Sequence, residues 1–266
     1  MRTTLMVSLL ATSLGLTTTC LLIIRVSVQQ EIRKGLTSAL APSHRHFHHL
    51  FRQRVQMLSR EAALLADLPS LKALMATQDT HTIQDGSQEF WTISGSDFFA
   101  LSSQTGKLFT YSNRGPALDD AQVARGLRAC MIDAGDPRMI ALGSRLYVLS
   151  VQPLYFGPPA NGSQLGYVII GYAIDHQVAR EVSEAAAADV VFMADDNVSA
   201  STLSIARLAD LRTQNLTLDY SNTTPRTIQL DHEVYVAAVS VIPAAGQEKV
   251  HLVVLKLGAD RSDFGR

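Results

Sequence analysis

The N-terminal part of the chain begins with a long apolar stretch. Residues 5–24 carry no charged side chain, and the stretch ends at Arg25. At a rise of about 1.5 Å per residue its length matches the roughly 30 Å hydrocarbon core of a bilayer. A secretory signal peptide is the alternative, but its apolar region usually spans about 7–15 residues and ends at a small-residue cleavage site. The pattern therefore predicts an uncleaved transmembrane anchor over residues 1–25.

A helical periodicity follows the apolar stretch. Apolar side chains recur at spacings of mostly three and four over about four heptads, which is typical of a helix that packs along one face. This stripe consists of Leu36, Leu40, Phe47, Phe51, Val55, Leu58, Ala62 and Leu65. We predict a helical stalk with connecting helices over residues 26–90, including short helices at 71–76 and 83–91. A stripe of this length can pack as a coiled-coil-like seam or against the face of a domain.

Beyond Ser96 the pattern of apolar residues changes from a helical spacing to the spacing typical of strands. The first unit has predicted strands at 98–102, 107–111, 145–156 and 166–174, with helices at 118–131 and 176–188. The second has predicted strands at 190–194, 198–202, 227–230, 235–241 and 250–257, with a helix at 205–212. Two such units predict an α+β fold with two antiparallel-sheet modules, residues 91–188 and 189–258, and a C-terminal tail over 259–266. The two units do not visibly align in sequence, so the predicted repeat is one of pattern only.

Composition narrows the class of protein. Hydrophobic residues make up 47% of the chain and charged residues 18%, which is too apolar for a disordered protein. Two cysteines cannot form a disulfide scaffold. Residues 1–60 carry eight Lys and Arg side chains against the single acid Glu31, whereas the remainder is acidic. A basic, apolar end indicates a membrane surface, and the acidic remainder counts against nucleic-acid binding.

The charges around the apolar stretch bear on its orientation. Arg2 and the terminal amine precede it, whereas Arg25, Arg33 and Lys34 follow it. By the positive-inside rule, this balance slightly favours a cytoplasmic C-terminal part.

Catalytic motifs are not found in the sequence. It has no glycine-rich phosphate-binding motif, no nucleophile elbow and no kinase signature. We therefore expect no enzymatic activity, no catalytic residue and no cofactor. His44 and His48, in a cluster with His46 and His49, are spaced to share a metal ion on a helix. Two imidazoles alone do not complete a tetrahedral site, so a solvated basic face is favoured and no metal ligand is predicted.

Aromatic and basic residues of the first module are candidates for a small-molecule site. A tyrosine or tryptophan combines an apolar ring with a polar tip, and arginine can bind a carboxylate through two hydrogen bonds. Such a lining suits an organic acid or an amino acid. The alternative is that the rings fill the core and the arginines face water. The candidate ligand-binding residues are Trp91, Tyr111, Arg114, Arg145, Tyr147 and Tyr172.

Three stretches carry a resemblance to a known family: residues 64–74 (LLADLPSLKAL), 90–97 (FWTISGSD) and 152–159 (QPLYFGPP). Together with the anchor, the long helix and the two modules, they resemble the double Cache sensory domains of bacterial transmembrane receptors, above all those of two-component sensor histidine kinases. The resemblance covers roughly residues 30–257. It implies PAS-like modules in the periplasm. Together with the one apolar stretch of the sequence, this predicts a single-pass protein of the inner membrane. The first module would lie away from the membrane and bind the small ligand, and the second would lie near the membrane.

Family members normally continue into a second transmembrane helix and a cytoplasmic output module, which this sequence does not contain. We therefore expect a sensor that binds a small molecule and signals through a partner such as a kinase. Its helical stripe is then expected to serve both as the seam of a homodimer and as the rod that transmits the signal. One alternative is the input fragment of a histidine kinase or diguanylate cyclase whose output is lost or encoded separately. The other is a non-catalytic anchored scaffold.

Overall fold

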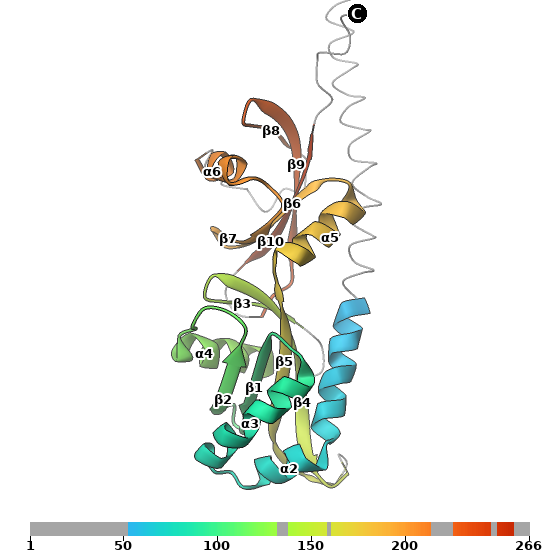
Figure 1. The fold of residues 1–266 in the computed structure, drawn as a ribbon, viewed down its shortest axis with the longest axis vertical. Helices are drawn as coiled ribbons and strands as arrows, with labels where there is room; N and C mark the ends of the chain where they lie inside the picture. The colour runs from blue at the N-terminus through green and yellow to red at the C-terminus, as the bar shows by residue number, and fades with distance from the viewer. Residues whose placement is uncertain (1–52, 132–137, 159–160, 214–225, 246–248, 258–266) are drawn as a thin grey trace, which may run out of the picture. The chain divides into compact units, whose positions relative to one another are not determined.

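The computed structural model describes residues 53–131, 138–158, 161–213, 226–245 and 249–257. In these residues the chain folds into two antiparallel five-stranded sheets with flanking helices (Figure 1). The predicted α+β class is thus confirmed. The predicted anchor, the four histidines, the first half of the stripe and the C-terminal tail lie outside the described residues. Among the helices that are described, none is both long enough and apolar enough to cross a membrane.

Between residue 53 and the first strand the chain forms three helices, and local chemistry sets their ends. The described part of the first helix covers residues 53–67. Helix α2 (Pro69–Ala76) starts with a proline, whose fixed φ suits the first turn. Helix α3 (Thr80–Ser94) is capped by the Asp79 carboxylate, which accepts from the Thr82 amide at 2.8 Å. It ends at Gly95, whose φ of 62° favours glycine.

The first sheet has the strand order β2-β1-β5-β4-β3, with every neighbouring pair antiparallel. Helix α4 (Asp120–Met131) lies between β2 and β3 in the chain. The edge strand β3 was not among the predicted strands. The five strands are β1 (Phe98–Ser102), β2 (Leu108–Asn113), β3 (Arg138–Leu142), β4 (Arg145–Phe156) and β5 (Ser163–Ile174).

The second sheet repeats the first. After α5 (His176–Ala186), its order β7-β6-β10-β9-β8 is the same order of strands, and α6 (Ile205–Thr213) takes the place of α4. The strands are β6 (Asp189–Ala194), β7 (Asn197–Ser201), β8 (Arg226–Leu230), β9 (Glu233–Ile242) and β10 (Val250–Leu257).

The repeat extends to the sequence of one hairpin, which corrects the expectation of a repeat in pattern only. Hairpin β3–β4 closes with Leu142 opposite Arg145, and hairpin β8–β9 closes with Leu230 opposite Glu233. Aligned by this register, the two hairpins share identical residues at Arg138/Arg226, Ile140/Ile228, Leu142/Leu230, Tyr147/Tyr235, Val148/Val236 and Val151/Val239. The weak similarity becomes visible only when the strand register fixes the alignment.

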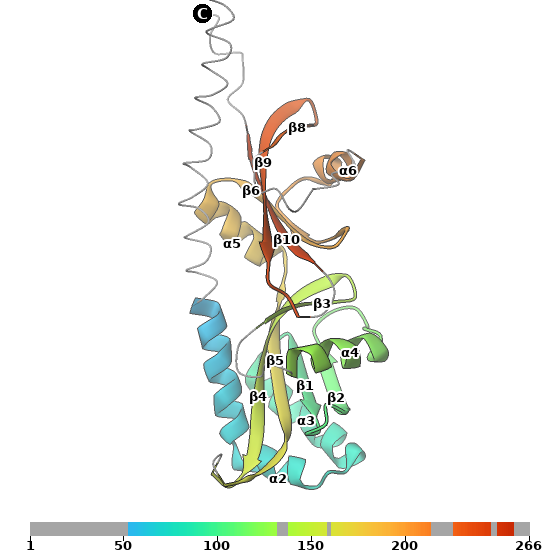
Figure 2. The ribbon, with the colours of Figure 1, turned by 180° about the vertical axis from the view of Figure 1, so that it is seen from behind.

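The first sheet is covered on both faces. Helix 53–67, α2 and α3 cover one face, and α4 covers the other, so that the strands lie between helix 53–67 and α4 in both views (Figures 1 and 2). Helix α5 packs against β6 and β7 of the second sheet instead. The stripe residues Leu58, Ala62 and Leu65 belong to the core on the first of these faces. In the described part, the stripe therefore packs within the chain, and these residues are not available for the dimer seam expected from the sequence.

The two sheets also share apolar contacts. Phe192 and Leu252 of the second sheet belong to the same buried cluster as Val148 and Ile170 of the first. At the edge of the first sheet, the Ala245 amide donates to the Met139 carbonyl at 2.7 Å. The loop that follows β9 thus protects part of the free edge of β3.

We predict that substitutions at the adjacent residues Ala62 and Ala63 differ sharply. Ala62 is fully buried, whereas Ala63 is exposed. Ala62→Leu should lower the free energy of unfolding by about 1–3 kcal/mol because the packed core has no room for the larger side chain. Ala63→Leu should change it by less than about 0.5 kcal/mol. Urea denaturation of both variants measures the difference, and equal effects would contradict the packing of this helix on the sheet.

Candidate functional site

The face of the first sheet beneath α4 carries a row of aromatic rings. Tyr111 of β2 stacks on Phe98 of β1, with ring centroids 6.2 Å apart, and Phe98 contacts the ring of Tyr147 at 5.6 Å. Phe98 and Tyr147 meet across β5, where Gly171 has no side chain. A Cβ at Gly171 would lie 2.3 Å from Cδ2 of Leu149. Glycine at this position thus permits the close packing of the row.

Tyr147 is the one tyrosine of this row with an unsatisfied hydroxyl. Its side chain is fully buried, and its hydroxyl has no hydrogen-bond partner among the described residues. The cluster around it is apolar, with Val123 and Leu127 of α4 and Ile140 of β3. A buried hydroxyl without a partner costs about 1–3 kcal/mol. A hydrogen-bond acceptor beside this hydroxyl would remove that cost. The Tyr172 hydroxyl, on the other face of the sheet, is likewise buried without a partner among the described residues.

Tyr111 and Arg145 hold the connection between β2 and α4 against the sheet. The Tyr111 hydroxyl donates to the Leu118 carbonyl at 3.0 Å and to Oδ1 of Asp120 at 2.8 Å. Partial burial, and then the hydrogen bond to Asp120, raise the pKa of Tyr111 to about 12. Nη1 of Arg145 donates to the Arg114 carbonyl at 3.1 Å. Both side chains therefore lie at the border of the α4 face, where they fix a connecting segment.

The remaining predicted residues are placed elsewhere. Trp91 lies on α3, where its indole Nε1 donates to the Ser96 carbonyl at 3.0 Å, and it packs against the core on the face away from α4. Tyr172 lies on that same face, where burial raises its pKa to about 12. The Arg114 side chain is exposed. The structure thus brings Tyr111, Arg145 and Tyr147 to the α4 face and separates Trp91 and Tyr172 from them.

Two polar residues of this face were missed by the sequence analysis. Cys130, on the inner side of α4, is buried, and burial raises the pKa of its thiol to about 12, although the nearby Arg138 acts in the opposite direction. Cys130 could have been found from its spacing of three from Leu127 and seven from Val123 on one helix face. Arg138 could not have been found, because it belongs to the strand that the pattern did not reveal.

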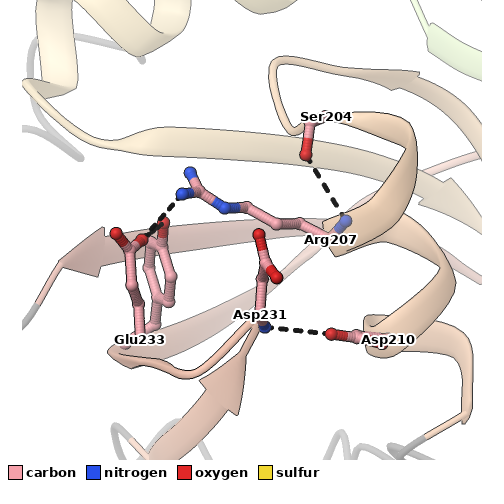
Figure 3. Close-up of polar contacts among 6 residues, drawn as sticks. Ser204, Arg207, Asp210, Asp231 and Glu233 are labelled. Carbon is pink, nitrogen blue, oxygen red and sulfur yellow. Dashed lines mark hydrogen bonds and ion pairs between the residues drawn. The ribbon is translucent and has the colours of Figure 1, made fainter.

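The corresponding face of the second sheet is polar at the same place (Figure 3). Arg207 reaches from α6 and donates to Oε2 of Glu233 at 2.7 Å, and the Tyr235 hydroxyl donates to the same oxygen at 3.0 Å. The Arg207 guanidinium lies 5.6 Å from the centre of the Tyr235 ring. Partial burial, followed by the bond to Glu233, raises the pKa of Tyr235. Here the protein itself satisfies the tyrosine.

The described ranges contain no group of three or more His, Cys, Asp or Glu side chains that could hold a metal ion.

Comparison with known proteins places the chain in a family. The profile of the double sensory domain of two-component sensor kinases matches residues 38–256, so the chain belongs to this family. This confirms the double Cache resemblance seen in the sequence. No curated protein matches the chain by sequence.

Solved structures show the same fold. The periplasmic domain of LuxQ from Vibrio cholerae superposes with a TM-score of 0.54 at 13% identity, over 82% of this chain and 98% of that domain. A domain of a putative sensory box/GGDEF family protein from Vibrio parahaemolyticus gives a TM-score of 0.52 at 14% identity, over 86% of this chain and 97% of that one. These likenesses concern the fold alone.

The shifted pKa of Cys130 predicts a pH dependence of stability. Because the folded protein raises the thiol pKa from 9.0 to about 12, the thiol holds its proton more tightly when folded. This contribution is complete below about pH 9 and is lost as the pH rises toward about 12, with a slope of at most about 1.4 kcal/mol per pH unit. Wild type should therefore lose stability more steeply over this range than Cys130→Ala. Val123→Ala, on the same face of α4, is the matched control and should run parallel to wild type. Chemical denaturation at several pH values measures this, and parallel curves for wild type and Cys130→Ala would contradict it.

Proposed function

We propose that this chain is the membrane-anchored, extracytoplasmic sensor of a signalling system and binds a small molecule on the α4 face of its first module. The observation that carries the proposal is the buried hydroxyl of Tyr147, which has no partner among the described residues. Membership in a double sensory domain family supports the sensing role. The ligand acts only through its different affinities for two states of the protein.

The membrane anchor is supported by the sequence, whereas the periplasmic location is supported by the family. The apolar stretch over residues 5–24 supports a single-pass anchor in the inner membrane. The family, together with the periplasmic location that the name of the LuxQ domain states, supports a periplasmic position for the bulk of the chain. The charges around the anchor argue for the opposite orientation. The boundaries of the distal module at 91–188 and of the proximal module at 189–258 remain part of this proposal.

A homodimer through the long helix is compatible with the packing of that helix on the sheet, provided that the dimer uses a face of the helix other than the buried stripe. Met57 and Leu64 are 60% and 72% exposed and lie seven residues apart on helix 53–67, away from the buried stripe. Seven residues correspond to two turns, so both side chains lie on one face of the helix. This face is the proposed dimer seam, and a shift of the same helix carries the signal to a partner such as a kinase.

A thermal-shift screen of the purified full chain tests the sensing proposal. Among organic acids, amino acids and amines, at least one compound should raise the melting temperature. A concentration of 100 times Kd stabilises the protein by about 2.7 kcal/mol. Tyr147→Phe should abolish or strongly reduce the response. Tyr235→Phe, the equivalent change in the second module, should leave it intact. A response that survives in Tyr147→Phe would place the ligand elsewhere.

Reporter fusions test the orientation. Alkaline phosphatase is fused after Leu40 or after Leu257, and green fluorescent protein is fused at the same two positions. We expect phosphatase activity at both positions, because that enzyme is active only in the oxidising periplasm. Fluorescence at both positions would instead support the orientation given by the charge balance and contradict the periplasmic proposal.

A further inference from the structure

We propose that the ligand of the first module presents a carboxylate that accepts the Tyr147 hydroxyl and pairs with Arg145, and that Glu233 is a built-in carboxylate at the equivalent place of the second module. This inference rests on the proposed function, since it specifies which chemical group the sensor binds. It also explains why the second module needs no ligand at this place.

The two tyrosines occupy equivalent positions. Tyr147 is the third residue of β4 and lies opposite Ile140, and Tyr235 is the third residue of β9 and lies opposite Ile228. Both side chains are buried, with 0% and 2% exposure, each on the sheet face covered by the helix of its module, α4 or α6. A difference between the two surroundings therefore reflects side chains and not a different backbone.

The difference is a reversal of charge. The residue two positions before Tyr235 is Glu233, whose carboxylate accepts both the Tyr235 hydroxyl and the Arg207 guanidinium (Figure 3). The residue two positions before Tyr147 is Arg145. Alternate residues of a strand point to the same face, so Arg145 and Tyr147 are neighbours on the α4 face as Glu233 and Tyr235 are on the α6 face.

Arg145 donates to the Arg114 carbonyl, and among the described residues no acceptor takes the place of Glu233 beside the Tyr147 hydroxyl. A guanidinium group carries only donors, so Arg145 cannot satisfy the Tyr147 hydroxyl as Glu233 satisfies Tyr235. A carboxylate placed between them accepts from both, and hydrogen bonds to charged groups are the stronger ones. A cationic or amine group at the same place would meet the positive charge of Arg145. Arg138 does not distinguish the modules, because Arg226 is its counterpart.

Two substitutions of Arg145 test the equivalence without a ligand. Arg145→Glu supplies the carboxylate that the second module has, whereas Arg145→Met removes the same guanidinium and supplies no acceptor. Arg145→Glu should melt about 2–4 °C above Arg145→Met, which corresponds to one hydrogen bond in a protein of this size. Far-UV circular dichroism shows that both variants are folded. Equal melting temperatures would overturn the equivalence of Glu233 and a ligand carboxylate.

Paired compounds then test the chemical group on the full chain. We use propionate and propionamide, succinate and succinamide, and alanine and alaninamide, and measure binding by calorimetry. At least one carboxylate should bind to wild type at least tenfold more tightly than its amide. Binding should be lost in Arg145→Glu, weakened about tenfold or more in Arg145→Met and in Tyr147→Phe, and unchanged in Tyr235→Phe.

The outcomes separate this inference from the proposed function. Undiminished binding in Arg145→Glu, or equal affinity for acid and amide, would overturn the carboxylate assignment. Binding of a neutral or cationic compound that depends on Tyr147 would overturn it too but keep the sensing proposal. If none of the six compounds binds and no compound of the broader screen does, both proposals fail.

Discussion

The burial of the first sheet on both faces is the constraint on which its site depends. All five residues of β1 are buried, and the helices on one side and α4 on the other exclude water from the strands between them. Any polar atom on these strands must therefore find its partner inside the protein. Tyr111 finds one because it lies at the border of the face, where the segment before α4 crosses it. Tyr147 lies deeper, among apolar side chains, and its hydroxyl has no partner among the described residues.

Most of the fold could be predicted from the sequence because periodicity is a local signal. Strand β4 and helix α5 start where the pattern places them, and β10 matches at both ends. The strand β4 even includes Pro153. Among the described residues, β3 pairs only with residues 145–149, so no described strand lies beside Pro153 on that side, and a proline is tolerated at such an edge. The strand β3 was missed because it is short and carries an arginine at its start. What covers the helical stripe could not be predicted either, since periodicity shows that a face is buried but not by what.

The candidate site was predicted only in part, for a reason of register. The sequence shows that Tyr147 and Tyr172 belong to strands, but the sheet face of each depends on how β4 and β5 pair. The structure pairs Tyr147 with Ala173, which puts Tyr172 opposite Val148 and on the other face. A shift of one residue in the pairing would have brought both tyrosines to one face. Such a register is set by contacts between residues that are distant in the chain, so the pattern of a single sequence does not predict it.

The duplicated hairpin shows how one framework can be used in two ways. Both copies keep the same strand register and share six identical residues, among them the buried tyrosine, so the position of that tyrosine in the hairpin is preserved. In the second copy, Glu233, two residues before the tyrosine, accepts its hydroxyl. The ion pair of Glu233 with Arg207 is partly solvated, because the side chains of Arg207 and Glu233 are 29% and 44% exposed. Such a pair adds little stability by itself, so its main effect is to satisfy the tyrosine. In the first copy Arg145 takes the place of the glutamate, and the Tyr147 hydroxyl has no hydrogen-bond acceptor among the described residues. Ala245 of the second module packs in the same cluster as Tyr147. A ligand group that accepts the Tyr147 hydroxyl would therefore bind within a core to which both modules contribute.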